Sequence, residues 1–499
     1  MKPTGFLSRS LLLLLAVPLT ACAVGPDYHQ PAAPQVALTP TPLPAQTRPA
    51  GGVAQVFAPG ADIAGDWWRL YHSPELDSLL SAALAQNPGL RAAQATLLQA
   101  EETERAYAGT LLPSLSAGFK AERGQNSTNS VAGTGAATST QPLPAYTLYN
   151  ASLSVSYALD IWGGARRELE STAAQAQYQR YELEAAYLTL TSNIVTAAIQ
   201  EASLRAQIDA TNQVIADEQQ QLGILQSQLS LGGVAQASVL QEQATLASSE
   251  ATLPPLQASL AQARNQLADY AGVLPGNFHE ADFTLAALHL PATLPVSVPS
   301  AIVAQRPDIQ AAAAQLHEAS ANVGVADAQM LPQISLTADL GHEAISTGDL
   351  FMPQTLLWSL VAGVTQPLFE GGQLAAKRQA ALAALRASGA QYQSTVIAAF
   401  QNVADALSAL QYDALTLNAA DTAAAAAAQS LALTQAQYRL GGQPLSAVLL
   451  AQINYQNAAI TQVKASAARL ADTAALYQAL GGGWWHRDDA GASCCGVIP

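Results

Sequence analysis

Two stretches of the chain, residues 165–231 and 373–440, contain no proline and are rich in Ala, Leu, Gln and Glu. These residue types favour helix, whereas a proline would interrupt one. At about 1.5 Å of rise per residue, each stretch would form a helix on the order of 100 Å long. Such a helix is several times longer than an ordinary domain is wide, so we expect it to belong to a rod or a tube.

The same pattern of prolines and glycines occurs twice along the chain. In each half a proline pair 25 residues apart is followed by two glycine pairs; the positions are Pro88, Pro113, 163–164 and 232–233, then Pro307, Pro332, 371–372 and 441–442. The glycine pairs are 69 residues apart in the first half (232 − 163) and 70 in the second (441 − 371). This spacing indicates an internal two-fold repeat.

Each repeat predicts a short helix, two strands, a very long helix, a glycine turn and a shorter helix. We expect a first repeat at 65–298, a second at 299–483 and a C-terminal tail at 484–499. Within the repeats we expect strands at about 114–124, 146–160, 333–343 and 355–369, and long helices at 165–231 and 373–440.

The four predicted strands alternate between apolar and small polar residues. Leu153, Val155 and Tyr157, for example, alternate with serines. Strands of roughly ten residues with this alternation suit a barrel wall that has lipid on one side and water on the other, although a half-buried soluble sheet gives the same local pattern. In the fourth strand we expect one face to carry Trp358, Leu360, Ala362 and Val364.

Four strands are too few to close a barrel, and an open sheet edge is not tolerated in lipid. Copies of the chain must therefore associate if the strands lie in a membrane. The fold class that follows is an α+β membrane protein.

The N-terminus has the layout of a targeting segment. Lys2 and Arg9 precede an apolar run at 11–19, and small residues then lead to Cys22. This resembles a bacterial lipoprotein signal, which predicts a signal peptide at 1–21, an acylated Cys22 and a Pro-rich extended tether over 22–64. The alternative is an ordinary secretory signal with a chance cysteine. Ala23 after the cysteine favours the outer membrane over the inner one.

Composition and motifs exclude several functions. The net charge of −15 disfavours nucleic acid, which needs a basic surface. The seven histidines are scattered, and no nucleophile elbow, phosphate loop or zinc spacing is present, so we expect no enzyme, no metal and no cofactor beyond the lipid on Cys22. Asp160 and Asp308 stand at element boundaries, which indicates capping rather than acid–base chemistry. Cys494 and Cys495 are adjacent and cannot cross-link a core.

Several short motifs together resemble the TolC-like outer-membrane efflux proteins, in particular the lipoprotein branch associated with resistance-nodulation-division pumps. They are CAVGPDY at 22–28, DWWRL at 66–70, NP at 87–88, LDIWG at 159–163, RPDI at 306–309, GVA at 324–326 and LP at 331–332. The resemblance implies a homotrimer in outer-membrane lipid, whose twelve-stranded β-barrel continues into a long periplasmic α-helical barrel. It also implies a periplasmic adaptor and an inner-membrane pump as partners.

The resemblance further implies a gate at the periplasmic end, near the second glycine pair of each repeat. We expect the turns there to contact the adaptor through Gly232, Gly233, Gly441 and Gly442. Relatives commonly carry charged gate residues just after the second turn, but residues 443–450 of this chain are uncharged. We therefore expect Leu445 or Leu449 to form an apolar constriction. We expect Tyr438 and Arg439 to make polar contacts nearby that help to close the gate.

The function predicted is a passive exit duct for small toxic compounds or drugs. A lipid-anchored periplasmic coiled-coil structural protein is the alternative, but it leaves the four alternating strands unexplained. The sequence indicates neither the transported compound nor the individual adaptor and pump.

Overall fold

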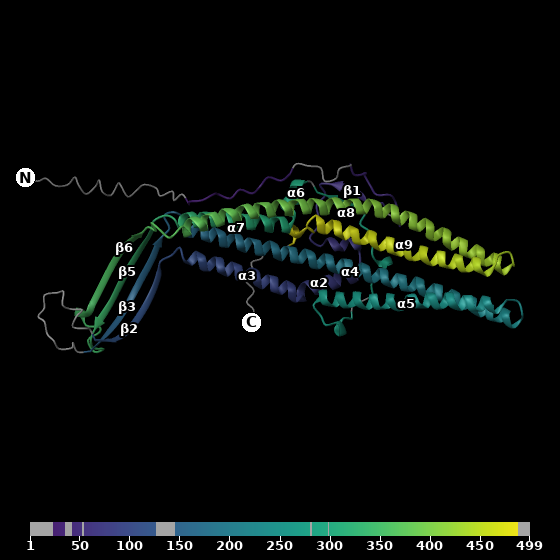
Figure 1. Ribbon diagram of the computed structural model, residues 1–499, viewed down its shortest axis with the longest axis horizontal. Coiled ribbons are helices and arrows are strands. Elements are labelled where there is room, and N and C mark those ends of the chain that lie inside the picture. Colours follow the sequence, from purple (N-terminus) through teal and green to yellow (C-terminus); the bar gives the residue numbers. More distant parts are fainter. Residues whose placement is uncertain are drawn as a thin grey trace, which may run out of the picture. The chain divides into compact units, whose positions relative to one another are not determined.

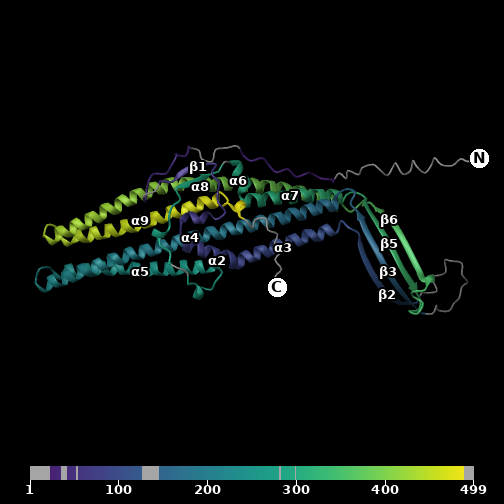
Figure 2. The same cartoon turned by 180° about the vertical axis from the view of Figure 1, so that it is seen from behind.

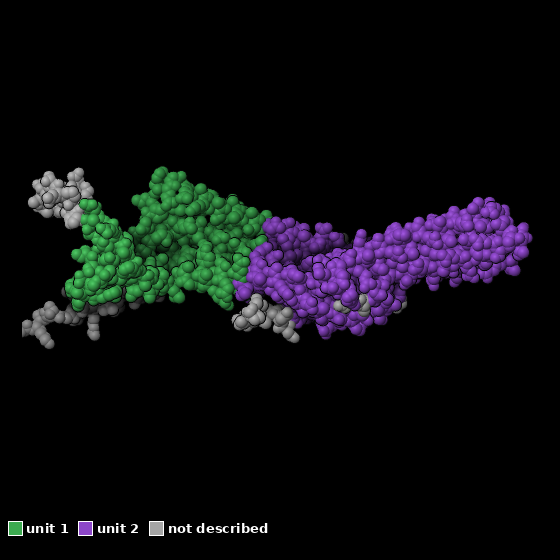
Figure 3. Space-filling model, turned by 90° about the horizontal axis from the view of Figure 1, so that it is seen from below, with its two compact units in different colours: residues 1–30, 99–177, 314–390 green, residues 31–98, 178–313, 391–499 purple. Residues whose placement is uncertain are grey.

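The computed structural model describes residues 23–34, 42–51, 54–125, 145–279, 282–297 and 299–487. The predicted signal peptide, Cys22 and the cysteines at 494 and 495 lie outside these ranges. Two compact units divide the chain (Figure 3). Unit 1 comprises residues 1–30, 99–177 and 314–390, and unit 2 comprises residues 31–98, 178–313 and 391–499. Each unit draws on both predicted repeats, because the long helices contribute residues to both units.

Unit 1 contains a four-stranded antiparallel sheet in the order β2-β3-β5-β6 (Figure 1). The strands are β2 (Ser114–Gly124), β3 (Tyr146–Leu159), β5 (Gln333–Ala344) and β6 (Leu356–Thr365). The pairing of β3 with β5, from Tyr149 opposite Ala344 to Leu159 opposite Ile334, joins the two halves of the sequence in the middle of the sheet. Helices α3 (Pro88–Gly109) and α7 (Pro307–Ala328) end shortly before the prolines at 113 and 332, as predicted.

One strand boundary was predicted wrongly. The fourth strand was expected to reach residue 369, but β6 ends at Thr365. Pro367 follows two residues later and has no N–H for a ladder hydrogen bond. Instead, the Gln366 side chain donates to the Met330 carbonyl at 3.0 Å, and Leu368 and Phe369 are exposed.

The long helices are α4 (Gly164–Ser230) and α8 (Gln373–Arg439), within one residue of the predicted bounds. In unit 2, α4 continues through a turn into α5 (Gln236–Ala271), and α8 into α9 (Leu445–Ala479), so that two helical hairpins form (Figure 2). The buried positions of α8 recur at steps of three and four residues; they include Val396, Ala399, Val403, Leu407, Leu410, Ala414 and Leu417. This spacing buries one narrow stripe of a helix against its neighbours. Among the described residues, no helix is both long and apolar enough to cross a membrane.

The extended segment before the first repeat is held firmly in unit 2. Strand β1 (Val56–Pro59) pairs in parallel with β4 (Thr293–Val296). The fully buried guanidinium of Arg469 donates to the Ala50 carbonyl at 2.6 Å, to Gln55 Oε1 at 3.2 Å and to Thr47 Oγ1 at 3.2 Å. The described residues of the predicted tether from 42 onwards are therefore packed against the helices of unit 2.

The start of the predicted C-terminal tail is packed as well. Trp484 Nε1 donates to the Gln305 carbonyl at 2.6 Å. Arg487 pairs with Glu184 at 3.0 Å and lies over the Tyr187 ring. Residues 484–487 are thus packed against unit 2 and do not form a loose tail.

Candidate functional site

The sheet of unit 1 has one apolar and one polar face. Its register aligns Leu340 with Trp358 and Ala338 with Leu360, so the apolar face predicted for the fourth strand is confirmed. That face is not covered by other parts of the described chain, and the Trp358 side chain on it is 74% exposed. Exposed apolar side chains occur on all four strands of the sheet; they include Leu115, Phe119, Leu153, Leu340, Leu360 and Val364. An apolar patch that covers a whole sheet is not stable in water and indicates a lipid or protein partner.

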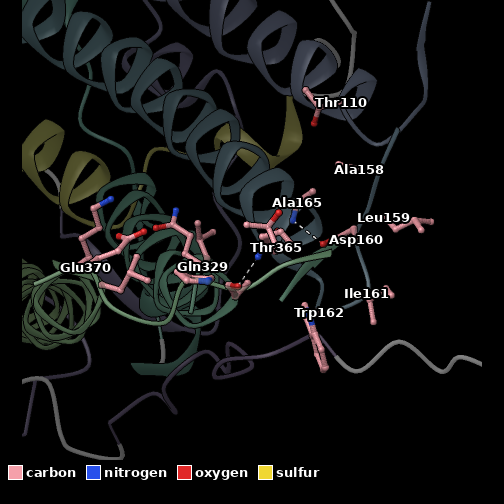
Figure 4. A pocket seen from close by; sticks show the side chains of 17 residues that line it. Thr110, Ala158, Leu159, Asp160, Ile161, Trp162, Ala165, Gln329, Thr365 and Glu370 are labelled. Atoms are coloured by element: carbon pink, nitrogen blue, oxygen red, sulfur yellow. Dashed lines mark hydrogen bonds between the residues drawn. The ribbon is translucent and has the colours of Figure 1, made fainter. Parts of the chain in front are cut away.

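A hollow of about 600 Å³ lies in unit 1 at the junction of the strands with the helices (Figure 4). Asp160 on its wall accepts hydrogen bonds from the backbone N–H groups of Ala165 and Arg166, both at 3.0 Å. A carboxylate at this position satisfies N–H groups that have no partner within the helix. The predicted capping role of Asp160 is confirmed. Among the described residues, no group of His, Cys, Asp or Glu could hold a metal ion.

The two turns at the ends of the helical hairpins in unit 2 have the same hydrogen bonds. The N–H of Gly233 donates to the Gln228 carbonyl at 2.8 Å, and the N–H of Gly442 donates to the Gln437 carbonyl at 2.8 Å. Gly232 and Gly441 both have φ of +76°, which favours glycine because it has no Cβ. Each turn is a Schellman motif, in which the last carbonyls of a helix are satisfied by backbone N–H groups beyond its end.

Each turn also presents one exposed leucine. Leu231 is 86% exposed and Leu440 is 88% exposed, at equivalent positions just before the glycines. No charged residue occurs between Glu218 and Glu242 or from residue 440 to 463. Apart from the exposed Arg439 at the end of α8, the ends of both hairpins are therefore apolar and uncharged.

Leu445 and Leu449, the residues predicted to form a constriction, are buried inside unit 2. They form one apolar cluster with Leu225 and Val239, against which Tyr438 and three other residues pack. This cluster joins the hairpin α4–α5 to the hairpin α8–α9. A side chain in such a cluster cannot line a water path, so the structure corrects the predicted position of both leucines.

The exposed apolar residues near the second turn lie on the other face of α9. Leu450 is 60% exposed and Ile453, three residues later on the same face, is 44% exposed. The Tyr438 hydroxyl donates to Gln228 Oε1 at 3.4 Å and so connects α8 with α4. Arg439 is exposed at the end of α8, with no ion pair to any described residue.

A buried polar group lies one helical turn from the apolar cluster. Glu242 on α5 is fully buried, and neither of its carboxylate oxygens has a hydrogen-bond partner among the described residues. Gln452 on α9 is buried in the same way, with both amide atoms unpartnered. Glu218 on α4 is also buried and accepts one hydrogen bond, from Ser249 Oγ at 2.9 Å.

Burial raises the pKa of Glu242 from 4.5 to about 7, and the neighbouring Glu218 charge adds to the shift. Burial also raises the pKa of Glu218, and burial with the charge of Glu242 raises the pKa of the Tyr438 hydroxyl. An isolated carboxylate in an apolar environment is unfavourable, so the protonated form is favoured. Packing at the hairpin ends is consequently coupled to proton uptake.

The sequence model of the outer membrane efflux protein family matches residues 79–273 and 298–482, which together make up well over half of the chain. The chain belongs to this family. The pyoverdine export outer membrane protein OpmQ of Pseudomonas putida is 29% identical over 486 residues, covering 96% of this chain and 98% of OpmQ. The OpmQ of Pseudomonas aeruginosa is 30% identical, covering 86% and 90%. The outer-membrane channel OprN has a TM-score of 0.83 at 25% identity, covering 93% of this chain and all of OprN.

The family resemblance predicted from the motifs is thereby confirmed. The protein is an outer-membrane efflux channel component, a passive exit duct with a periplasmic part, and neither an enzyme nor a cofactor-binding protein. The alternative of a coiled-coil structural protein is excluded.

Sequence reasoning missed Leu450, Glu242 and Gln452. A signal for Glu242 was present, because it follows Val239 by three residues and so shares its helix face within an uncharged stretch. No such signal distinguished Leu449 from Leu450. The helical spacing of apolar residues is compatible with either leucine on the buried face, and it does not tell which face of the helix meets the other hairpin.

We predict that the stability of the hairpin ends against local unfolding depends on pH, because it depends on the ionisation of Glu242. Because the folded pKa of this carboxyl is raised, its ionisation lowers stability little below pH 4.5, and stability is lost as pH rises from 4.5 to about 7. Glu242→Gln removes this loss, on the order of 3 kcal/mol at most. Hydrogen exchange, corrected for intrinsic rates, should show greater protection of residues 219–250 in the variant at pH 8 and little difference at pH 5.

Asp269→Asn serves as the matched control, because Asp269 is exposed on the same helix and is not among the charges that raise the pKa of Glu242 or Glu218. It should leave the pH dependence as in the wild type. Some pH dependence should remain in Glu242→Gln because Glu218 is still present; equal protection of variant and wild type at pH 8 would contradict the assignment.

Proposed function

We propose that the chain is one protomer of a homotrimer, whose twelve strands close a single β-barrel in the outer membrane and continue into an α-helical barrel in the periplasm. The observation that carries this proposal is the exposed apolar face of a four-stranded sheet whose outer strands, β2 and β6, each have one unpaired edge. Lipid satisfies the apolar face but cannot satisfy the edges, since it offers no hydrogen bonds to backbone groups. Pairing β6 of one copy with β2 of the next removes every edge.

We further propose that Cys22 is acylated and anchors the mature chain at the outer membrane. A supporting feature is the docking of the residues that follow it onto unit 1. Val24 N–H donates to the Trp162 carbonyl at 3.0 Å, and Asp27 pairs with the buried Arg167 at 2.6 Å. A lipid on Cys22 would therefore start close to residues that adjoin the sheet.

The assembly is tested on the full-length protein purified in detergent. We expect a trimer that dissociates only on heating, with stable conductance in planar bilayers, and an intact mass that includes the acyl groups on Cys22. A monodisperse monomer without conductance would contradict the proposal, because a lone sheet of four strands cannot enclose water.

The gate is proposed at the ends of the helical hairpins, with the exposed Leu450 as its apolar constriction. In this arrangement Leu445 and Leu449 hold the hairpin α8–α9 against α4–α5, and the hydrogen bond from Tyr438 to Gln228 fixes their register. Three copies of Leu450 would narrow the opening without a charge. Apolar constrictions close channels by excluding water.

Leu450→Ser should raise single-channel conductance, because a smaller polar side chain admits water. Leu240→Ser is the matched control, since Leu240 is a similarly exposed leucine on α5. We expect the control to retain wild-type conductance. If both variants conduct as the wild type does, the constriction lies elsewhere.

The two turns are proposed to bind the periplasmic adaptor of a tripartite pump, of the resistance-nodulation-division type. The surface formed by Leu231, Leu440 and the glycines at 232, 233, 441 and 442 is apolar and leaves backbone groups accessible. Because residues 231–233 and 440–442 of the two turns carry no charge, an adaptor would recognise them by apolar contact and backbone hydrogen bonds. Such contacts depend little on ionic strength, unlike contacts between exposed charges.

Adaptor capture should therefore persist when NaCl is raised from about 0.1 M to 1 M, a change that shortens the Debye length from ~10 to ~3 Å. The double variant Leu231→Asp and Leu440→Asp should lose capture, because binding would bury charges without partners. Leu274→Asp is the control, as Leu274 is equally exposed beyond the end of α5. Capture by the double variant at the wild-type level would exclude the turns as the contact.

A further inference from the structure

The polar face of the sheet in unit 1 has one carboxylate at its middle. The register places Ser154, Asp339 and Ser359 side by side on three neighbouring strands. The hydroxyl of Ser154 donates to Asp339 Oδ1 at 2.5 Å, and that of Ser359 donates to Oδ2 at 3.0 Å. Both carboxylate oxygens are thus held by neutral donors, which fix the side chain without cancelling its charge.

The other charged residues on this face are engaged differently. Lys120 and Glu122 form an ion pair at 2.6 Å near the ends of β2 and β3. Glu343, near the end of β5, accepts a hydrogen bond from Asn150 at 3.3 Å. With one cation and three carboxylates the face is net negative (1 − 3 = −2 per chain), and Asp339 has no ion pair with any described residue.

The hairpin ends offer no comparable charge. Residues 219–241 and 440–463 contain no ionisable Asp, Glu, Lys, Arg or His side chain. The exposed charge next to these residues, Arg439 at the end of α8, is a cation, so the gate region cannot favour cations through an exposed side-chain charge. Any preference for cations must come from another part of the channel wall.

We infer that Asp339 is a selectivity-determining residue of the channel. The inference rests on the proposed trimer, in which the polar face lines the lumen and three copies of Asp339 form a carboxylate ring around it. Rings of acidic side chains favour cations in channels. The two serine donors hold each carboxylate at the wall of the lumen. From there the electric field of the carboxylates acts on ions that pass within about one Debye length.

The position of Asp339 also explains why this acid is tolerated in the sheet. A carboxylate on the lipid face of a barrel would be costly, whereas one on the water-filled side keeps its hydration. Gly341, two residues along β5, is closely covered by the Ala151 carbonyl and Ser152, so the wall beside Asp339 is densely packed.

The test is the reversal potential of the reconstituted trimer in a KCl gradient. The wild type should prefer K⁺, and Asp339→Asn should lose at least half of the reversal potential. Asp339→Lys should reverse its sign, whereas Asp339→Glu should retain it. Asparagine can keep both contacts to the serines, so the Asn variant should remain a heat-dissociable trimer.

Asp349→Asn is the matched control, because it removes the same charge from the connection between β5 and β6, outside the sheet. Its reversal potential should stay near that of the wild type. The preference of the wild type should also weaken when the measurement moves from about 0.1 M to 1 M salt.

An unchanged reversal potential in a conducting Asp339→Asn trimer would overturn the inference and leave the proposed channel intact. An equal loss in Asp349→Asn would also overturn it, because selectivity would then follow total charge. A wild-type protein that does not conduct at all would instead refute the proposed function.

Discussion

The unpaired backbone groups along the outer edges of β2 and β6 are the constraint on which the rest of the structure depends. Within the sheet every strand interior is paired, but two edges remain, and the face beside them is apolar. A hydrophobic surface alone could be covered by many partners. Edges that lie in lipid, however, need hydrogen bonds from another strand. In the proposed assembly, the chain is therefore one segment of a wall.

The long helices α4 and α8 contribute residues to both compact units. A proline-free run of 67 residues in both α4 and α8 lets one element contribute to both compact units. Tertiary packing stabilises these helices through narrow buried stripes, and capping at Asp160 satisfies the start of α4. At their other end, the Schellman turns at Gly232 and Gly441 satisfy the last carbonyls with backbone groups alone, which leaves the leucines beside them free for contacts outside the chain.

Most of the fold follows from the sequence, because it depends on local patterns. Prolines at 113 and 332 end helices, alternation over ten residues gives strands, and positive φ at Gly232 needs a glycine. The site was less predictable. Leu449 and Leu450 are adjacent and chemically equal, yet one is buried and the other 60% exposed, since only the packing of α9 against the other hairpin distinguishes them. The helix face of Glu242 could be read from its spacing to Val239, but its burial near Glu218 of α4 and Tyr438 of α8 depends on how the helices pack.

The order of the strands also determines how a closed wall can be assembled. Antiparallel pairing through β2, β3, β5 and β6 gives each copy two strands that run away from the helices and two that return. The seam between copies thus joins a returning strand to an outgoing one and is itself antiparallel. Any whole number of copies preserves this alternation, so strand direction does not limit the ring size. The curvature of the wall, and the angle at which neighbouring hairpins pack, must set the count.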